Sequence, residues 1–323
     1  QAEDGIRDRS PSRGLGDVYK RQVSEDEEGM RLDRWIKKKF PDIAHSLVER
    51  LLRKGKILLN DHKILASKRV SVGEKITFNY HFSSKKHTPS VAHKYKVTKS
   101  DKILLKNIIL YEDDSLVVIN KPNGIAVQGG TKIHRHIDGM TEGLKLVHRL
   151  DKDTSGILLL AKNSRAANHC AAAFRERKIE KVYWALVQGR IKRTSGLIDY
   201  PLLDSKKTKK TYTRYKTIDH VAEAMSWVSL SPLSGRKHQL RIHCALFGHS
   251  IIGDKKYGDY KKRKKFYDLK DDLYLHACQL SMPHPEGGSL SLSAPLPKHM
   301  QKAWRLFGFN IKNFKLGNCV RGR

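Results

Sequence analysis

The chain has 323 residues, of which 64 are lysine or arginine and 33 are aspartate or glutamate, for a formal net charge of +31 at pH 7. This length predicts two domains, and the charge predicts a polyanionic partner, with nucleic acid ahead of an anionic membrane surface. With neither an apolar run of the roughly 18 residues that a spanning helix needs nor a secretory leader, we expect a soluble, cytoplasmic protein.

Residues 1–22 lack apolar periodicity and contain the run Gly5-Ile6-Arg7-Asp8-Arg9-Ser10-Pro11-Ser12-Arg13. This run resembles translated sequencing-adapter sequence. We therefore interpret residues 1–22 as a non-native leader that contributes nothing to the fold.

Residues 23–82 predict a small domain of two helices and two short strands. Leu32, Ile36 and Phe40 recur at helical spacing, and the pairs Leu47/Leu51 and Val48/Leu52 do so again. Pro41 separates the two helices and Gly55 ends the second, and strands are expected at 57–59 and 75–78. Basic side chains crowd these helices, which predicts a phosphate-contacting surface that includes Arg31, Arg34, Arg53 and Lys54.

Three short motifs of this domain resemble the RNA-binding module named after ribosomal protein S-four. They are Arg31-Leu32-Asp33, Gly55-Lys56-Ile57-x-x-Asn60 and Val72-Gly73-Glu74-x-Ile76. The Asn-Gly turn that is usual in this module is Asn60-Asp61 here. The resemblance implies that residues 23–82 bind RNA.

Residues 83–105 show little periodicity and indicate a basic linker. From 106 to 323 short strands are expected at 116–119, 157–161, 182–187, 212–218 and 224–230. Helices are expected at 164–178, with Ser164 as N-cap, and at 237–247, ended by Gly248. This mixture predicts an α+β domain with a mixed, largely antiparallel sheet and flanking helices.

The stretch His148-Arg149-Leu150-Asp151-Lys152-Asp153-Thr154-Ser155-Gly156 combines charged and hydroxyl residues and runs directly into an apolar, buried strand. It places the carboxylate of Asp151 beside Arg149 at the mouth of a sheet. In so basic a protein, an acid held there indicates chemistry, although an aspartate that caps a turn is the alternative. The same stretch imitates a calcium loop, but Lys162 stands where that loop needs a bidentate glutamate.

Metal sites are not expected from the four scattered cysteines either. Three lie near histidines, in His169-Cys170, His243-Cys244 and His276-x-Cys278. This spacing fits no familiar zinc pattern, and scattered cysteines without a C-x-x-C pair are typical of a reducing compartment. Buried free thiols are the simpler interpretation.

Four separated blocks carry a second resemblance. They are Asn120–Gly124, His148–Gly156, Lys181–Val187 and Ser234-Gly235-Arg236-Lys237-His238-Gln239-Leu240-Arg241-Ile242-His243. Together, and in this order, they resemble the RluA-type RNA pseudouridine synthases over nearly all of residues 29–310. Val127–Gly130 and Leu275–Ala277 favour the C type of this family over the related D type.

The resemblance implies isomerisation of uridine, in which the N-glycosidic bond breaks, the base rotates, and the base rejoins the sugar through carbon. No redox change or energy input is needed, so no cofactor is expected. Asp151 is implied as the single catalytic carboxylate, and Arg241 as the partner that keeps it ionised. Whether Asp151 attacks the sugar, attacks the base or removes a sugar proton stays open.

Further residues follow from the same resemblance. Tyr183 would lie against the base and relay a proton, and Arg149 would fill the space that the flipped uridine leaves. Lys121, His148 and Arg236 are expected to bind substrate or RNA. The implied partner is large-subunit ribosomal RNA, with no obligate protein partner and a monomeric enzyme, and the lysine clusters at 206–210 and 255–265 would contact the RNA backbone.

Three other classes remain as alternatives. A catalytically silent RNA-binding or assembly factor would not need Asp151, Tyr183 and Arg241 together. A metal-dependent nuclease would need clustered carboxylates, and a membrane-surface protein would need an amphipathic helix with a clean apolar face. Tyr183 could also be a core aromatic, and His238 and His243 are more simply structural.

Overall fold

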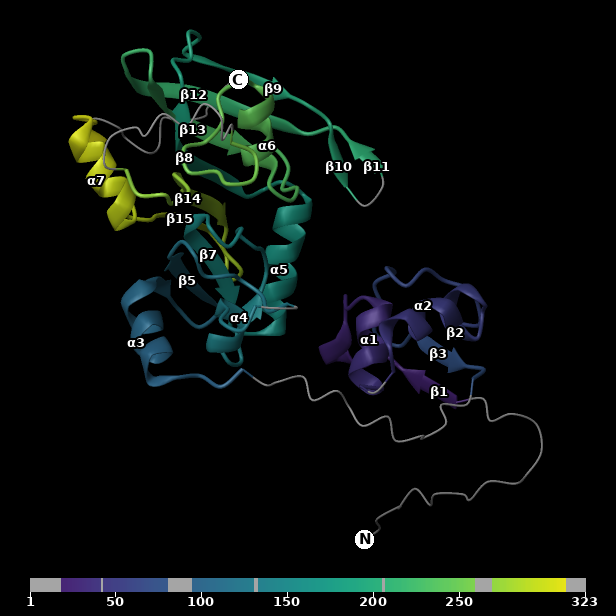
Figure 1. Ribbon diagram of the computed structural model, residues 1–323. Coiled ribbons are helices and arrows are strands. Elements are labelled where there is room, and N and C mark those ends of the chain that lie inside the picture. The colour runs from purple at the N-terminus through teal and green to yellow at the C-terminus, as the bar shows by residue number, and fades with distance from the viewer. Residues whose placement is uncertain are drawn as a thin grey trace, which may run out of the picture. The chain divides into compact units, whose positions relative to one another are not determined.

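A computed structural model describes residues 19–41, 43–80, 95–130, 133–204, 207–258 and 269–311. The chain divides into two compact units, residues 1–93 and residues 94–323 (Figure 1). Residues 1–18, the linker residues 83–94, Lys206, the basic stretch 259–265 and Cys319 lie outside the described residues. No helix in the described ranges is long and apolar enough to span a membrane.

The small unit has the two helices and two strands that its sequence predicts, with one strand more. Its elements are β1 (Tyr19–Gln22), the 3-10 turn η1 (Glu25–Glu27), α1 (Leu32–Lys39), α2 (His45–Arg53), β2 (Ile57–Leu59) and β3 (Lys75–Phe78). The three strands pair antiparallel in the order β1-β3-β2. Both helices bury their apolar stripe against this sheet, and Leu32, Trp35 and Ile36 of α1 are fully buried.

The expectation that residues up to 22 lie outside the fold is wrong for Tyr19–Gln22. Strand β1 pairs with β3, with Tyr19 opposite Phe78, and the Tyr19 ring packs 6.0 Å from the rings of both Phe40 and Phe78. All four β1 residues are exposed. Backbone pairing at a sheet edge therefore holds this strand, and backbone pairing leaves no hydrophobic pattern in the sequence.

The large unit is an α+β domain built on a 10-stranded sheet in which β7 and β14 are parallel and the other paired neighbours antiparallel, as predicted. The strand order is β4-β5-β7-β14-β8-β13-β12-β9, with β15 on β14 and β6 on β7. The elements in chain order are α3 (Lys99–Ile108), β4 (Ile109–Glu112), β5 (Leu116–Lys121), α4 (Ile137–Met140), β6 (Lys145–Leu146), β7 (Ser155–Ala161), α5 (Ser164–Arg175), β8 (Glu180–Gln188), β9 (Ser195–Asp199), β10 (Leu202–Asp204), β11 (Lys207–Lys209), β12 (Tyr212–Val221), β13 (Met225–Pro232), α6 (Gln239–Leu246), β14 (Leu275–Pro283), β15 (Ser289–Ser293) and α7 (Lys298–Leu306).

The predicted linker ends too late, because α3 begins at Lys99. The Thr98 side chain caps this helix and exchanges hydrogen bonds with Asp101. The Asp101 carboxylate also accepts hydrogen bonds from Tyr95 at 2.7 Å and from Arg135 at 2.9 Å. Residues 95–105 are thus part of the large unit.

Two predicted helix starts also need correction. The N-cap of α5 is Asn163, whose side chain accepts from the Ala166 amide, one residue before the predicted Ser164. Helix α6 begins at Gln239 because the preceding residue, His238, has a left-handed backbone with φ of 56°. The elements of the large unit that were not predicted are α3, β4, α4, β6, β9, β10, β11, β14, β15 and α7.

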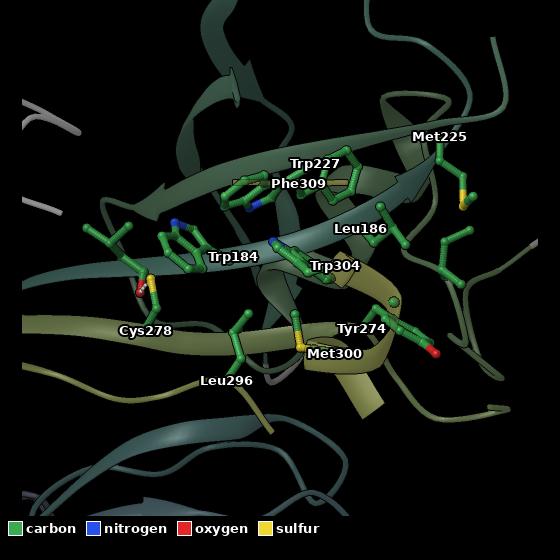
Figure 2. Packing of buried hydrophobic residues seen from close by; sticks show 13 residues of the cluster. Trp184, Leu186, Met225, Trp227, Tyr274, Cys278, Leu296, Met300, Trp304 and Phe309 are labelled. Carbon is green, nitrogen blue, oxygen red and sulfur yellow. Dashed lines mark hydrogen bonds between the residues drawn. The ribbon is translucent and has the colours of Figure 1, made fainter. Parts of the chain in front are cut away.

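The central strand β8 separates two cores by the alternation of its side chains. Trp184 and Leu186 pack on one face with Trp304 of α7 (Figure 2), in a cluster that also includes Val182. Tyr183, Ala185 and Val187 lie on the opposite face, which α6 covers. Polar residues of α6 and the aromatic ring of Tyr183 therefore meet on the same side of the sheet.

Strand β7 is buried along its whole length, as expected for a strand that is covered on both faces. Ala166, Cys170 and Ala173 of α5 pack against one side of it, next to Ile157 and Leu159. Cys170, Cys244 and Cys278 are buried free thiols.

Candidate active site

A cavity of about 1110 Å³ opens in the large unit. It is lined by the turn that precedes β7, by β8, by the connection from β13 into α6, and by β14 and β15. Asp151, Tyr183 and Arg241 all lie on its wall. Its volume exceeds the roughly 300–1,000 Å³ of common ligand pockets, so it has room for more than one small ligand or nucleotide.

The turn that carries Asp151 is held from beneath by Lys121, at the end of β5. The Lys121 ammonium donates to the carbonyls of Pro122 and Ile125 at 2.8 Å and of Lys152 at 3.0 Å. The side chain has no exposed surface, and burial lowers its pKa to about 7, against the pull of Asp153 and Asp151. The expectation that Lys121 contacts RNA is therefore wrong, because its buried ammonium donates its hydrogen bonds to the backbone of two turns.

A glycine sets the distance between Asp151 and Tyr183. At Gly156 the φ angle is 112°, and a Cβ built there would lie 2.2 Å from the Ala277 carbonyl oxygen. Only glycine permits so close an approach of β7 to β14. Ala277 is in register with Gly156 on one side and with Tyr183 of β8 on the other, so β14 alone separates Tyr183 from the start of β7.

The phenol of Tyr183 stays protonated over the physiological range. Burial and the nearby charge of Asp151 both raise its pKa above the ordinary value. A neutral phenol beside a carboxylate can stack against a base and donate a proton or a hydrogen bond.

Arg241 binds a second carboxylate that sequence reasoning missed. Its guanidinium makes two hydrogen bonds of 2.7 Å to Asp254, while its remaining Nη1 lies 4.0 Å from Asp151 Oδ2. Arg241 thus holds Asp254 directly and faces Asp151 with its third nitrogen. The resemblance implied only the second of these contacts.

Asp254 belongs to a tight turn, and its carboxylate also accepts from the amides of Lys256 and Tyr257 at 2.9 and 3.0 Å. Burial alone would raise the pKa of Asp254, but the hydrogen bonds from Arg241 and these amides lower it. The signal in the sequence was weak, an acid in Gly253-Asp254-x-x-Tyr257-Gly258 ahead of the basic run 261–265.

His238 approaches Asp151 from the other side. Its Nε2 lies 3.6 Å from Asp151 Oδ1, and its Nδ1 shares a 2.8 Å hydrogen bond with the Tyr257 hydroxyl. Burial lowers its pKa, although Asp151 opposes this. A left-handed histidine is a strained conformation that often marks functional sites. His243, in contrast, bonds to Thr211 and the Tyr200 carbonyl, away from Asp151.

The remaining residues expected to bind RNA in the large unit fall into two groups. Arg149 and Arg236 are exposed and line the cavity. His148 instead accepts a 2.8 Å hydrogen bond from the Leu159 amide and packs on Phe174. Burial lowers the pKa of His148 to about 3, so it is a neutral brace for the turn on the cavity wall.

In the small unit, Arg34, Arg53 and Lys54 are exposed. Arg31 is partly buried and forms an ion pair with Asp33. RNA binding by these four residues stays a prediction. Over the described ranges, no group of three or more histidines, cysteines or acids could hold a metal ion.

Comparison with known proteins agrees with this geometry. The family pattern of RNA pseudouridylate synthase matches residues 115–246. The chain is 34% identical over 301 residues to the ribosomal large subunit pseudouridine synthase C of Vibrio cholerae, covering 87% of this chain and 94% of that protein. It is 35% identical over 302 residues to the protein of the same name from Pasteurella multocida, covering 87% and 91%.

A solved structure is similar as well. Human RNA pseudouridylate synthase domain containing 4 matches with a TM-score of 0.56 and 29% identity, covering 65% of this chain and 97% of that one. The chain therefore belongs to the RluA-type family of RNA pseudouridine synthases and is an isomerase.

Proposed function

We propose that this chain isomerises specific uridines of large-subunit (23S) ribosomal RNA to pseudouridine, with Asp151 as the catalytic carboxylate and Tyr183 and Arg241 beside it. The observation that carries the proposal is the meeting of these three residues, from distant parts of the sequence, on the wall of one cavity. The curated relatives that cover most of this chain carry names that specify the large ribosomal subunit.

The reaction breaks the bond between N1 of the base and C1′ of the ribose and forms a bond from C5 of the base to the same carbon. The C5 proton leaves, and N1 ends protonated, so the product is an isomer of the substrate. Asp151 is the carboxylate that would face the reacting ribose and base, and the Arg241 guanidinium lies 4.0 Å from it. The protonated phenol of Tyr183 is placed to stack on the base and to serve the proton steps.

The uridine must leave its stack to enter the cavity. Arg149 lies two residues before Asp151 in the same turn and is exposed at the cavity. We assign it to the space that the flipped nucleotide leaves, and Arg236 to the RNA strand at the same mouth. Such cationic contacts supply salt-dependent affinity.

The proposal assigns residues 23–82 to RNA binding in the manner of the S-four module, with Arg31, Arg34, Arg53 and Lys54 on its contact surface. The structure adds β1 to that unit. We further propose that the enzyme acts in the cytoplasm as a monomer without an obligate protein partner, a setting to which its buried, reduced thiols are suited.

Incubation with unmodified large-subunit ribosomal RNA tests the proposal, with pseudouridines mapped by carbodiimide-blocked primer extension. We expect stops at discrete uridines with the native protein. Asp151→Ala should lower the rate by about 10⁴-fold or more. Asp153→Ala is the matched control, because Asp153 lies in the same turn, is exposed, and should leave the stops in place.

Two outcomes would contradict the proposal. Stops that persist with Asp151→Ala would remove Asp151 from the chemistry. Tight RNA binding without stops, on naked RNA and on assembly intermediates alike, would favour the catalytically silent assembly factor.

A further inference from the structure

The cavity wall includes a cationic side chain, Lys181, to which no role has been assigned above. Lys181 lies two positions before Tyr183 on β8, so both side chains lie on the same face of the strand, about 6.6 Å apart along it. Lys181 lines the cavity together with Tyr183 and Asp151. Its side chain is partly buried, and burial lowers its pKa.

The described residues around the Lys181 ammonium supply no ion-pair partner. Among the described residues, no carboxylate lies within ion-pair distance of its nitrogen. The Phe174 ring lies beneath it, with the nitrogen 5.7 Å from the ring centroid. The neighbouring His148 is neutral, and its own pKa is lowered by burial and by the charge of Lys181.

Gly235 leaves one side of this ammonium open. A Cβ built at Gly235 would lie 3.8 Å from the Lys181 nitrogen, so a longer side chain there would cover the charge. The glycine lies between the exposed mouth residue Arg236 and Ser234, both also on the cavity wall. The ammonium is therefore accessible from the side on which RNA would enter.

A partly desolvated charge without a partner is costly in the free protein. The cost is offset when a ligand brings the opposite charge. Uridine itself is neutral, and the only anionic groups of RNA are its phosphodiesters. An ammonium is a compact point charge that suits phosphate.

From this geometry we propose that Lys181, with the Phe174 ring and Gly235, forms a subsite for a phosphodiester that flanks the target uridine. This inference rests on the proposed function of the cavity. The uridine base would lie at Tyr183, and its neighbouring phosphate would lie at Lys181, two residues earlier on the same face of β8. Lys181 thereby fixes the position of the flipped nucleotide along the strand.

The test pairs a protein change with a change in the RNA. An RNA fragment around a mapped uridine is assembled by ligation, so that the phosphodiester on its 5′ or its 3′ side is a neutral methylphosphonate. The native enzyme should lose roughly 10-fold or more in kcat/KM with one of the two replacements. Lys181→Met should lose about as much with unmodified RNA, and should lose nothing further with that same methylphosphonate.

Lys216→Met is the matched control, because Lys216 is an exposed strand lysine that does not line the cavity. It should respond to the methylphosphonates as the native enzyme does. Lys181→Gln serves as a second variant if the methionine variant does not fold, and the same non-additive loss is expected.

The outcomes separate the two claims. If neither methylphosphonate impairs the native enzyme, or if the losses from protein and RNA changes multiply as independent effects, the subsite is wrong while the proposed function stands. If the native enzyme forms no pseudouridine in large-subunit RNA, the proposed function falls and the subsite falls with it.

Discussion

The small unit and the catalytic cavity use charge in opposite ways. In the small unit the fold rests on an apolar core, and basic residues such as Arg53 and Lys54 stand exposed on its helices. In the cavity the charges are interlocked, since Arg241 joins Asp254 to the side of Asp151, and Lys121 ties the Asp151 turn to β5. Surface charges can be removed without unfolding, whereas Arg241, Asp254 and Lys121 also maintain the geometry around Asp151.

The largest effect is expected where one buried charge positions another. Asp254→Asn leaves the Arg241 guanidinium without its anionic partner, which should destabilise the large unit by about 3–5 kcal/mol. It should also lower kcat by roughly 100-fold, with little change in RNA affinity. Thermal unfolding and single-turnover kinetics measure both.

The control for Asp254 is Asp271→Asn, because Asp271 is exposed and its ion pair with Lys255 lies at the surface. Its stability and rate should match those of the native protein. An Asp254→Asn enzyme with native kcat would show that Arg241 needs no anchor.

Lys121→Met tests whether the interlocking extends to the protein backbone. The methionine fills the apolar space but leaves the carbonyls of Pro122, Ile125 and Lys152 without their donor. We expect a loss of about 3 kcal/mol in the free energy of unfolding of the large unit, with hydrogen exchange increasing in the Asp151 turn. Lys102→Met, at an exposed lysine of α3, should change neither. Native-like protection of the turn in Lys121→Met would rule out this bracing role.

The described part of the small unit has two buried acids, Glu27 and Asp33, and the lowered pKa of each makes the stability of the unit depend on pH. Glu27 accepts hydrogen bonds from Trp35 at 2.6 Å and Ser24 and pairs with Lys39 at 2.7 Å. Burial opposes ionisation, but these partners prevail and lower its pKa to about 2, from 4.5. Because the pKa is lower in the folded state, the stabilisation is full above about pH 4.5 and is lost as the pH falls toward 2.

Hydrogen exchange in α1 and β3 should therefore accelerate over this acid window in the native protein. Glu27→Gln should weaken the unit by roughly 2 kcal/mol at neutral pH and reduce its response to acid, with Asp33 supplying the remainder. Glu25→Gln, at an exposed acid of the same turn, should keep the native profile. An unchanged acid response in Glu27→Gln would assign the effect to other groups.

The smallest effect is expected on the surface of the small unit. Replacing Arg53 and Lys54 together by glutamine should weaken RNA binding by about 5-fold and reduce the dependence of affinity on salt, while stability and kcat remain native. Filter binding over a salt series measures this. Glu49→Gln on the same helix should not weaken binding, and a double variant with native affinity would place the RNA contacts elsewhere.

The sequence pattern predicted those helices and strands whose burial leaves a hydrophobic period in the sequence. The helical spacing of Leu32 and Ile36 and the apolar run of β7 predicted their elements within a few residues, because burial of one face or of both faces leaves a period in the sequence. The motif around Asp151 predicted the family for a similar reason, since its spacing is dictated by one local turn. The sequence missed β1, whose residues are exposed and are joined to the sheet by backbone pairing with β3.

Only the tertiary structure decided what each charge in the cavity does. The sequence shows Lys121 and Arg149 only as two basic residues. In the structure Lys121 is buried beneath the Asp151 turn, whereas Arg149 is exposed at the cavity mouth. Asp254 and Lys181 come from segments far apart in the chain. Arg241 joins Asp254 to the side of Asp151, and the pairing of β7, β14 and β8 brings Lys181 to the same cavity wall. A pattern of residue types records which charges are present, but their pairing depends on distances that the folded sheet alone sets.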